Sequence, residues 1–537
     1  MSQPLQSINL VAPGFKGINT EDSPMSEDYS FADVADNAVI DKRGRIASRK
    51  GVRLWTQDNQ GIGDAFVKTI HHFFDDVGNE AIFVTANQRV FMSESTTDYM
   101  DTLTDVTPAG YLITNDDWKI VNFNGAAYFF QVGLEPLVYT HDEGLRTYTE
   151  VVGADTNPRF FCHEAIAAYG RLFVVDNGAD KQIVSWSDLL IGTDFEGGSS
   201  GSIEVNKAWP DGHDEVVALA AHNDKLIVFG MHSILVYADA FSPSMMVLDD
   251  TVSGVGCIDR NSVQTIGTDV LFMDKSGLRS FGRVIQEKSL PLSDLSVNVK
   301  TDLIAMIDNR VGPVSSVFSP EHSFYLLTLP EERKTFCFDV KGRLENNSFR
   351  VTEWTLRPFT AWERRHTDGK LLTGTKDGLG EYSGYSDEVN NGGNIEQTSY
   401  LFRYYSPSLT FGDPSKLKFL KKIRPTVIGA NTASVRIKWA YDFSSTFSTA
   451  VFGIGSQIPY YYSSPKDDSV GFISEGGLAE YSQDGLAEYT GGELTTRPPI
   501  NATGSGSVVT IGLESDINGF ALSLQEINVL ALMGKTL

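Results

Sequence analysis

The sequence is poor in the residues that most often bind metals or form cross-links. It has three cysteines and nine histidines among 537 residues. The cysteines are odd in number, far apart and set in apolar runs, so we expect neither a disulfide framework nor a CxxC metal site; they are Cys162, Cys257 and Cys337. His163 and Glu164 begin an HExxH pattern that Ala167 leaves incomplete. We therefore expect no metal and no cofactor, in a chain made in a reducing cytoplasm.

Long apolar runs are absent as well. No stretch of 18 apolar residues occurs, and the start, MSQPLQSINLVAPG, lacks a basic region followed by an apolar one. We expect neither a membrane span nor a signal peptide. The string GGSSG at 197–201 satisfies GxSxG, but its flanks do not read as the strand and helix of a nucleophile elbow. No carboxylate pair is nominated for glycoside hydrolysis, so the prediction is that the protein is not an enzyme.

Basic residues are few but concentrated. The chain has 44 lysines and arginines against 69 acidic residues, a net charge of −25, which opposes binding to nucleic acid. Eleven of the 44 lie in two stretches, 41–53 and 411–425. These eleven are Lys42, Arg43, Arg45, Arg49, Lys50, Arg53, Lys416, Lys418, Lys421, Lys422 and Arg424. We hypothesise that both stretches meet acidic surfaces of neighbouring subunits or partners; the alternative is a solvated edge strand or short helix.

One pattern recurs through the middle of the chain: an apolar run, a polar or glycine turn, and a second run that ends in or near an aromatic residue. Its seven instances begin at Ala81, Ala126, Arg171, Lys225, Asp269, Ser323 and Lys370. The spacings of 45, 45, 54, 44, 54 and 47 residues are typical of four-stranded propeller blades, each instance being two adjacent strands. We predict an all-β fold with a β-propeller of six or seven blades over 61–394; an array of sandwiches would give similar spacing.

The terminal regions differ from the middle. Residues 1–60 are polar with one helix-like piece, 26–39, and a short helix is expected near 293–307. Residues 395–537 read as longer alternating strands, interrupted by a Gly, Ser and Tyr-rich loop at about 453–506. We predict that the two terminal regions form an additional β-rich platform domain. In the loop we expect a distal gate that includes Tyr460, Tyr461, Tyr462, Tyr481 and Tyr489.

Several strings resemble a known family. APGFKGINTEDSP and FADVADNAVIDKRGRIASRKGVRLWT near the start, with GDPSKLKFLKKIRP and VRIKWAYDFSSTF near the end, resemble the tail tubular or nozzle proteins of short-tailed (podovirus-type) bacteriophages. The resemblance implies a structural virion protein, a homo-hexameric ring assembled in the host bacterial cytoplasm and carried in the virion tail. It implies a portal or adaptor ring above, needle, fibre or spike proteins below, and genomic DNA that crosses the channel without sequence-specific binding during ejection.

A second function stays open at this point. A propeller can also serve as a receptor-binding or tail fibre protein that recognises a bacterial surface glycan. The loop aromatics Tyr460, Tyr461 and Tyr462 could stack on sugar rings in that case, although an aromatic hairpin explains them equally well.

Overall fold

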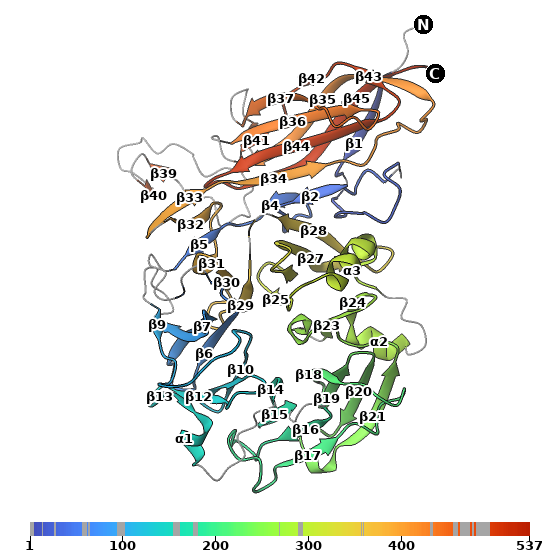
Figure 1. Ribbon diagram of the computed structural model, residues 1–537. Coiled ribbons are helices and arrows are strands. Elements are labelled where there is room, and N and C mark those ends of the chain that lie inside the picture. Colours follow the sequence, from blue (N-terminus) through green and yellow to red (C-terminus); the bar gives the residue numbers. More distant parts are fainter. Residues whose placement is uncertain are drawn as a thin grey trace.

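The computed structural model has an all-β architecture, with 52% of residues in strands and 6% in helices. It describes residues 5–12, 14–25, 28–55, 62, 65–93, 103–153, 162–175, 181–267, 269–287, 294–355, 357, 359–391, 393–429, 433–454, 460–461, 473–474, 477–478 and 494–536. Within these ranges, no helix is long and apolar enough to cross a membrane. Both termini lie at one end of the molecule, and successive small sheets fill the other (Figure 1).

Seven small antiparallel groups of strands, which we call the first to seventh sheets, follow one another along the chain from Thr69 to Tyr382. The first five are separate sheets, whereas the sixth and seventh are parts of larger sheets of nine and six strands. The first four sheets are β6 (Thr69–Phe74), β7 (Glu80–Ala86), β8 (Arg89–Ser93) and β9 (Thr104–Asp105); β10 (Lys119–Phe123), β11 (Ala126–Phe130), β12 (Leu137–Thr140) and β13 (Gly144–Thr147); β14 (Glu164–Ala168), β15 (Arg171–Val175), β16 (Ile183–Trp186) and β17 (Gly201–Glu204); and β18 (Val216–His222), β19 (Lys225–Gly230), β20 (Ser233–Ala238) and β21 (Val247–Ser253). The other three are β22 (Gln264–Ile266), β23 (Asp269–Asp274) and β24 (Gly277–Ser280); β25 (Ser315–Ser319), β26 (Phe324–Leu329), β27 (Lys334–Arg343) and β28 (Phe349–Thr355); and β29 (Ala361–Arg364), β30 (Leu371–Thr375) and β31 (Gly378–Tyr382).

All seven hairpins expected from the repeated pattern are present. Each predicted pair is the second and third strand of one sheet, from β7 with β8 to β30 with β31. Tight turns between the first and second strands have positive φ at both central residues, as at Asn124 with Gly125 and Asn223 with Asp224. These are the residue types that tolerate a two-residue hairpin turn. The pattern was predictable because hairpins are local in sequence.

The seven sheets are arranged around a common centre. Each sheet is open, but contacts between first strands run from β6 to β10, β14 and β18, continue through the fifth sheet to β25 and β29, and return to β6. Neighbouring sheets pack through buried aromatic pairs, such as Phe83 with Phe129 and Phe229 with Phe272, whose ring centroids are 5.1 and 4.9 Å apart. We call strands β6 to β31 the sheet ring, which Figure 1 shows in its lower part.

Two layers of strands at the other end of the molecule form what we call the platform: one is a nine-stranded sheet, and the other is the far part of a second nine-stranded sheet, which continues through β2 (Val34–Asp36) into β28 of the sixth sheet. One contains β1 (Leu5–Leu10), β3 (Ala38–Ile40), β4 (Ile46–Ser48), β35 (Lys416–Gly429), β45 (Leu522–Thr536), and the short β38 (Tyr460–Tyr461), β41 (Leu494–Thr496), β42 (Ile500–Asn501) and β43 (Ser505–Gly506). The other contains β34 (Tyr400–Tyr405), β36 (Ser434–Tyr441), β37 (Ser448–Gly453) and β44 (Val509–Ile517). Apolar side chains from both, such as Ile423 and Ile437, share one buried core.

The N-terminal segment joins the sheet ring to the platform. β2 (Val34–Asp36) pairs with β28 of the ring on one side and β34 of the platform on the other. β5 (Val52–Leu54) pairs with β31 and with β32 (Asp387–Asn391), which forms a hairpin with β33 (Asn394–Thr398). The seventh sheet therefore receives its fourth strand from residues that precede the first sheet.

Of the two helical segments expected from the sequence, one near the start and one in the middle of the chain, the first is wrong and the second is confirmed. The piece 26–39 is not a helix, since it contains β2 and the start of β3; Ser26, expected to cap it, lies outside the described residues. Its backbone groups bond to strands that are distant in sequence, so tertiary pairing overrides the local pattern. The short helix expected within 293–307 is present as α3 (Lys300–Asp308).

A buried ion pair lies at the junction of these parts. Arg49 has no exposed surface; its Nη1 and Nη2 donate to Oδ1 and Oδ2 of Asp387 at 3.0 and 2.7 Å, and its Nε donates to Asn37 Oδ1 at 3.0 Å. The guanidinium also lies over the Tyr400 ring, 4.0 Å from its centroid. Burial alone would raise the pKa of Asp387, but Arg49 outweighs it and holds that pKa below its usual value. The N-terminal segment is thus fixed to β32 and β34 by one side chain.

Replacing Arg49 by alanine should destabilise the protein by about 3–5 kcal/mol, because the Asp387 carboxylate would stay buried without its partner. Urea-induced unfolding measures this, and exposed Arg53→Ala is the matched control, with a change of about 1 kcal/mol or less. Since the pKa of Asp387 is lowered in the fold, the contribution of the pair is present above the ordinary aspartate pKa and should vanish as pH falls through the lowered value. Equal losses for the two variants at neutral pH would contradict this account.

Candidate functional site

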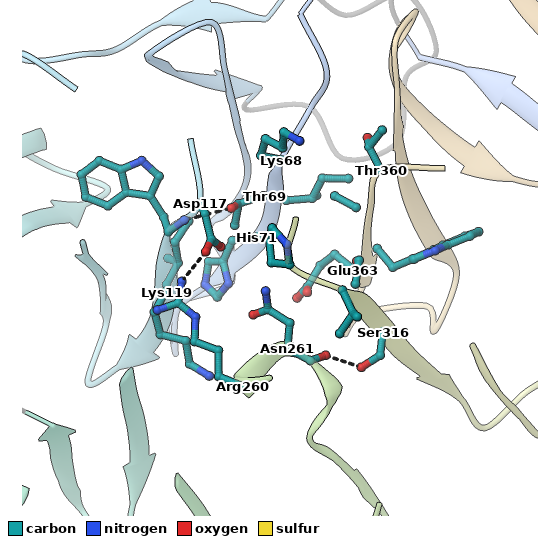
Figure 2. A pocket seen from close by; sticks show the side chains of 18 of the residues that line it. Lys68, Thr69, His71, Asp117, Lys119, Arg260, Asn261, Ser316, Thr360 and Glu363 are labelled. Atoms are coloured by element: carbon teal, nitrogen blue, oxygen red, sulfur yellow. Dashed lines mark hydrogen bonds and ion pairs between the residues drawn. The ribbon is translucent and has the colours of Figure 1, made fainter. Parts of the chain in front are cut away.

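A small polar cavity lies where the first strands of several sheets meet. It has a volume of about 190 Å³ and is lined from β6, β10, β22, β25, β29 and the segments beside them. Figure 2 shows Lys68, His71, Asp117, Lys119 and Glu363 around it, which come from three different sheets. We call it the axial cavity.

Most charges of the axial cavity are paired with one another. Lys119 Nζ lies 2.7 Å from Glu164 Oε1, and Arg260 Nη2 lies 3.0 Å from Asp117 Oδ2. The carboxyl of Glu164 is 1% exposed; burial raises its pKa, and Lys119 and Arg260 offset that burial only in part. The first pair joins the first strands of the second and third sheets, and the second pair joins the second sheet to the segment that precedes the fifth. Both pairs therefore stabilise the packing of the sheets.

Two neutral groups remain in the cavity. Burial raises the pKa of Glu363 to about 8 and lowers the pKa of His71 to about 4. His71 Nε2 lies 2.7 Å from Asn122 Oδ1; the Asn122 amide donates to the His72 carbonyl, so its oxygen accepts the His71 proton. An acid and an imidazole that are both uncharged at neutral pH suit water or a small neutral polar molecule.

The axial cavity does not assemble a hydrolytic pair from its described lining. Glycosidases use two carboxyl groups across the scissile bond, and here Asp117 is held by Arg260 while Glu363 is mostly protonated. Of these residues, only Glu164 was named from the sequence, in the incomplete HExxH pattern. The other residues were not predicted, because the cavity is lined by short segments of five sheets that are far apart in sequence. Their common feature is that most lie on or beside the first strand of a sheet.

A second site, the basic cleft, lies between the platform and the sheet ring. Its volume is about 460 Å³. On the platform side, the cleft is lined by β3, β4 and the start of β45. On the ring side, it is lined by strands β27 and β31 and by the turn that precedes β26. Apolar and aromatic residues, including Val39, Phe324, Tyr382 and Leu522, line it together with the basic residues Lys42, Arg43, Arg45, Lys50 and Lys341.

The basic cleft has an excess of positive charge. Only two carboxylates line it, those of Asp41 and Glu321, and Asp41 is held by the guanidinium of Arg45 at 2.6 Å. Lys42 and Lys50 have no carboxylate partner among the described residues; Lys50 Nζ instead lies 3.4 Å from His322 Nε2. Burial and then Lys50 lower the pKa of His322 to about 4. The cleft is therefore suited to an anionic group.

Four of the six basic residues expected from the first stretch line this cleft, and two do not. Lys42, Arg43, Arg45 and Lys50 come together there. Arg49 is buried in its ion pair with Asp387, so the expectation that it faces a partner is replaced by an internal role. Arg53 is exposed on β5, outside the cleft lining.

The second basic stretch lies on β35, a central strand of the platform sheet rather than an edge strand or helix. Lys421 and Lys422 are exposed, and Arg424 is half-buried. Lys416 is paired with Asp413 at 2.9 Å, whereas Lys418 is buried and donates to backbone carbonyls, so it offers no charge to a partner. Lys422 is opposite Leu530 of β45, seven residues from the cleft residue Ser523, or roughly 23 Å along an extended strand. The two stretches share a sheet but form separate basic surfaces.

The tyrosines of the expected gate are mostly outside the described residues. Tyr460 and Tyr461 form β38, which pairs with β41; Tyr462, Tyr481 and Tyr489 fall outside the description. β41, β42 and β43 pair with β35, so the loop returns to the platform sheet. The gate stays a prediction.

The described residues contain no group of three His, Cys, Asp or Glu side chains placed to hold a metal ion. His163 Nε2 bonds to the Val216 carbonyl at 2.9 Å, and Glu164 is paired with Lys119, so the incomplete HExxH is part of the packing. The three cysteines are buried and form no disulfide with one another, and burial raises the pKa of Cys257 to about 12.

Comparison with known proteins adds little. No protein-family model and no curated protein matches the chain. A solved structure of PorZ, described as an essential bacterial surface component of the type-IX secretion system of Porphyromonas gingivalis, is similar over 67% of this chain and 44% of that one, with 10% identity and a TM-score of 0.36. The chain thus spans less than half of that structure, and a likeness this low carries no argument.

Replacing Glu363 by glutamine should make stability less dependent on alkaline pH. The unfolded chain loses the Glu363 proton near pH 4.5, whereas the fold keeps it up to about pH 8, so the wild type loses stability as pH rises through that window. Between pH 5 and pH 9 we expect the wild type to lose on the order of 4 kcal/mol more than Glu363→Gln. Urea unfolding across pH measures it, with exposed Glu196→Gln as control; parallel profiles would show that Glu363 is not held neutral.

Proposed function

We propose that the chain is a structural subunit of a multi-copy ring, the tail nozzle of a short-tailed bacteriophage, and that its sheet ring is a seven-bladed β-propeller. The propeller rests on seven consecutive sheets whose first strands contact one another in a cycle. It rests also on β5, which completes the last sheet with a strand from before the first and so joins the two ends of the cycle. Seven is the upper of the two blade numbers expected from the repeats.

DNA does not pass through the centre of a single chain in this proposal. The axial cavity holds about 190 Å³ and is crossed by ion pairs. A duplex, whose major groove alone is about 12 Å wide, cannot enter it. The conduit is instead enclosed by several copies, each of which contributes part of the wall. Six copies would carry 6 × (−25) = −150 charges, which discourages adhesion of DNA.

The observation that carries the proposal is the basic cleft. In a chain of net charge −25, four of its basic residues and Lys341 gather at the junction between platform and ring, and Lys42 and Lys50 lack carboxylate partners among the described residues. The chain as a whole is acidic, so a neighbouring copy can supply the opposite charge, as can an acidic surface of an adaptor ring. Lys421 and Lys422 on β35 provide a second basic surface. Two separate basic surfaces fit two contacts, one between copies of the chain and one with the adaptor ring above. In this proposal, needle or fibre proteins bind at the lower end of the ring.

The purified protein should form rings. Mass photometry and negative-stain images, with the adaptor protein added if needed, should show a sixfold particle with a central opening. Raising the salt concentration should weaken the assembly, because exposed charges are screened. A particle that stays monomeric under every condition and binds host cells by itself would favour the receptor-binding alternative.

Charge reversal should separate the two basic surfaces. Lys42→Glu with Lys50→Glu, and Lys421→Glu with Lys422→Glu, should each weaken ring or adaptor assembly about tenfold or more, since like charges would then face each other. Lys207→Glu with Lys275→Glu, two exposed lysines of the sheet ring, is the matched control and should assemble as the wild type does. Sedimentation velocity measures assembly, and circular dichroism checks the fold. Unchanged assembly in both pairs would contradict docking by these residues.

A further inference from the structure

Three consecutive large apolar residues are exposed on the sheet ring. Leu189, Leu190 and Ile191, in the link between β16 and β17, are 53%, 55% and 46% exposed. Single exposed apolar residues are common on proteins, but a run of three is not without a function. The run is held in a fixed conformation: the Leu190 N–H donates to the Gly170 carbonyl at 2.9 Å, and the Leu190 carbonyl accepts from Asn124 Nδ2 at 2.7 Å.

A second exposed apolar group lies in the corresponding link of the next sheet, between β20 and β21. Phe241, Met245 and Val247 are 58%, 69% and 61% exposed. Met245 ends the short helix η1 (Pro243–Met245), and Val247 begins β21. The same connection in two neighbouring sheets thus presents large apolar side chains to solvent.

The two groups lie on the same face. The turn at Tyr169 and Gly170 lies between them: Gly170 accepts from Leu190, and the Tyr169 hydroxyl donates to the Lys225 carbonyl at 2.9 Å. On the far side, Ala240 N–H donates to the Asp224 carbonyl at 3.2 Å. Figure 1 shows β16, β17 and β21 at the end of the molecule away from both termini. We call Leu189, Leu190, Ile191, Phe241, Met245 and Val247 the apolar patch.

The stretch of chain that carries the apolar patch is strongly acidic. Residues 186–250 contain 11 acidic residues and two basic ones, a net charge of 2 − 11 = −9, more than a third of the −25 of the whole chain. Of the two lysines, Lys225 is paired with Asp249 at 2.7 Å. Asp224, Asp239 and Glu196 are exposed. Such a rim repels nucleic acid and anionic lipid, and it attracts lysine and arginine side chains.

An open strand edge adjoins the apolar patch. β21 pairs with β20 on one side, and no other described strand pairs with it. Its outer backbone groups can accept a further strand, a common way of binding an extended segment.

We infer that the apolar patch is a docking surface for a partner protein whose contacting segment alternates or combines apolar side chains with lysines and arginines. This goes beyond the proposed function, since the patch lies away from the platform, the basic cleft and β35. A second copy is disfavoured as the occupant. A basic surface with an exposed apolar residue lies on the platform, at Lys421, Lys422 and Phe419. Joining that surface to the apolar patch of another copy would connect opposite ends of the molecule and build an open filament instead of a closed ring.

Defined peptides test the chemistry of this surface. Three labelled peptides of equal length, built from Leu and Lys, Ser and Lys, or Leu and Glu, are titrated with the full-length protein and followed by fluorescence anisotropy. We expect the Leu–Lys peptide to bind at least about tenfold tighter than the other two. Leu189→Ser with Leu190→Ser should reduce that affinity about tenfold, and Asp224→Asn with Asp239→Asn should reduce both the affinity and its dependence on salt.

Matched controls keep the test specific. Leu112→Ser removes an isolated apolar residue that is 80% exposed elsewhere on the ring and should leave binding unchanged. If the leucine pair unfolds the protein, Phe241→Ser with Met245→Ser carries the test, because both side chains are more than half exposed. Lys42→Glu with Lys50→Glu should bind the peptide normally, so a failure of ring assembly does not decide this inference.

Four outcomes would overturn the inference. Equal affinity for the Ser–Lys peptide would mean that charge alone acts, and unchanged binding in both serine variants would place the site elsewhere. Filaments that disappear in the serine variants would make a second copy the occupant. Adsorption to phosphatidylcholine vesicles through the same residues would make it a lipid-binding surface.

Discussion

The structure depends on one guanidinium that has no contact with solvent. Arg49 holds Asp387 with two hydrogen bonds, Asn37 with a third, and the face of Tyr400 by stacking, so a single side chain fixes the order of the N-terminal segment, β32 and β34. On either side of it, β2 and β5 insert into sheets made of much later residues. A buried charge is costly unless every partner is in place, which makes the junction nearly all-or-none. The sheet ring and the platform are therefore coupled parts of one structure.

Charge is sorted along the molecule. Basic side chains gather where the platform meets the ring, and two of them, Lys42 and Lys50, lack a carboxylate partner in the described part of the chain. Residues 186–250, by contrast, carry about a third of the net negative charge and include the exposed apolar side chains of the apolar patch. The axial cavity between them is internally neutralised by its ion pairs and by the uncharged forms of His71 and Glu363. The charged surfaces suited to contacts with other molecules thus lie at the two ends, whereas the charged residues at the centre of the ring stabilise the packing of the sheets.

Sequence reasoning was accurate where structure is local. The seven hairpins were predictable because apolar runs and turn residues within about 16 positions determine them. The expected helix at 26–39 was wrong, because its backbone pairs with strands hundreds of residues away. Charge counting found the basic cleft but could not separate Lys50, which faces it, from its neighbour Arg49, which is buried. Glu363 and Arg260 were not predictable either. They belong to parts of the chain that are distant in sequence, and only the contacts between the sheets bring them to one cavity.

The position of the N-terminal segment also has a consequence in time. Asp36 binds Arg403, which is 367 residues later in the chain, and β5 completes a sheet that ends at Tyr382. At roughly 5–20 residues per second, a ribosome needs about 20–70 s to make the intervening chain. During that interval β2 and β5 lack the strands they pair with, and the sheet ring cannot be completed until Tyr382 and the residues before it have been synthesised. The segment made first is among the last to find its place.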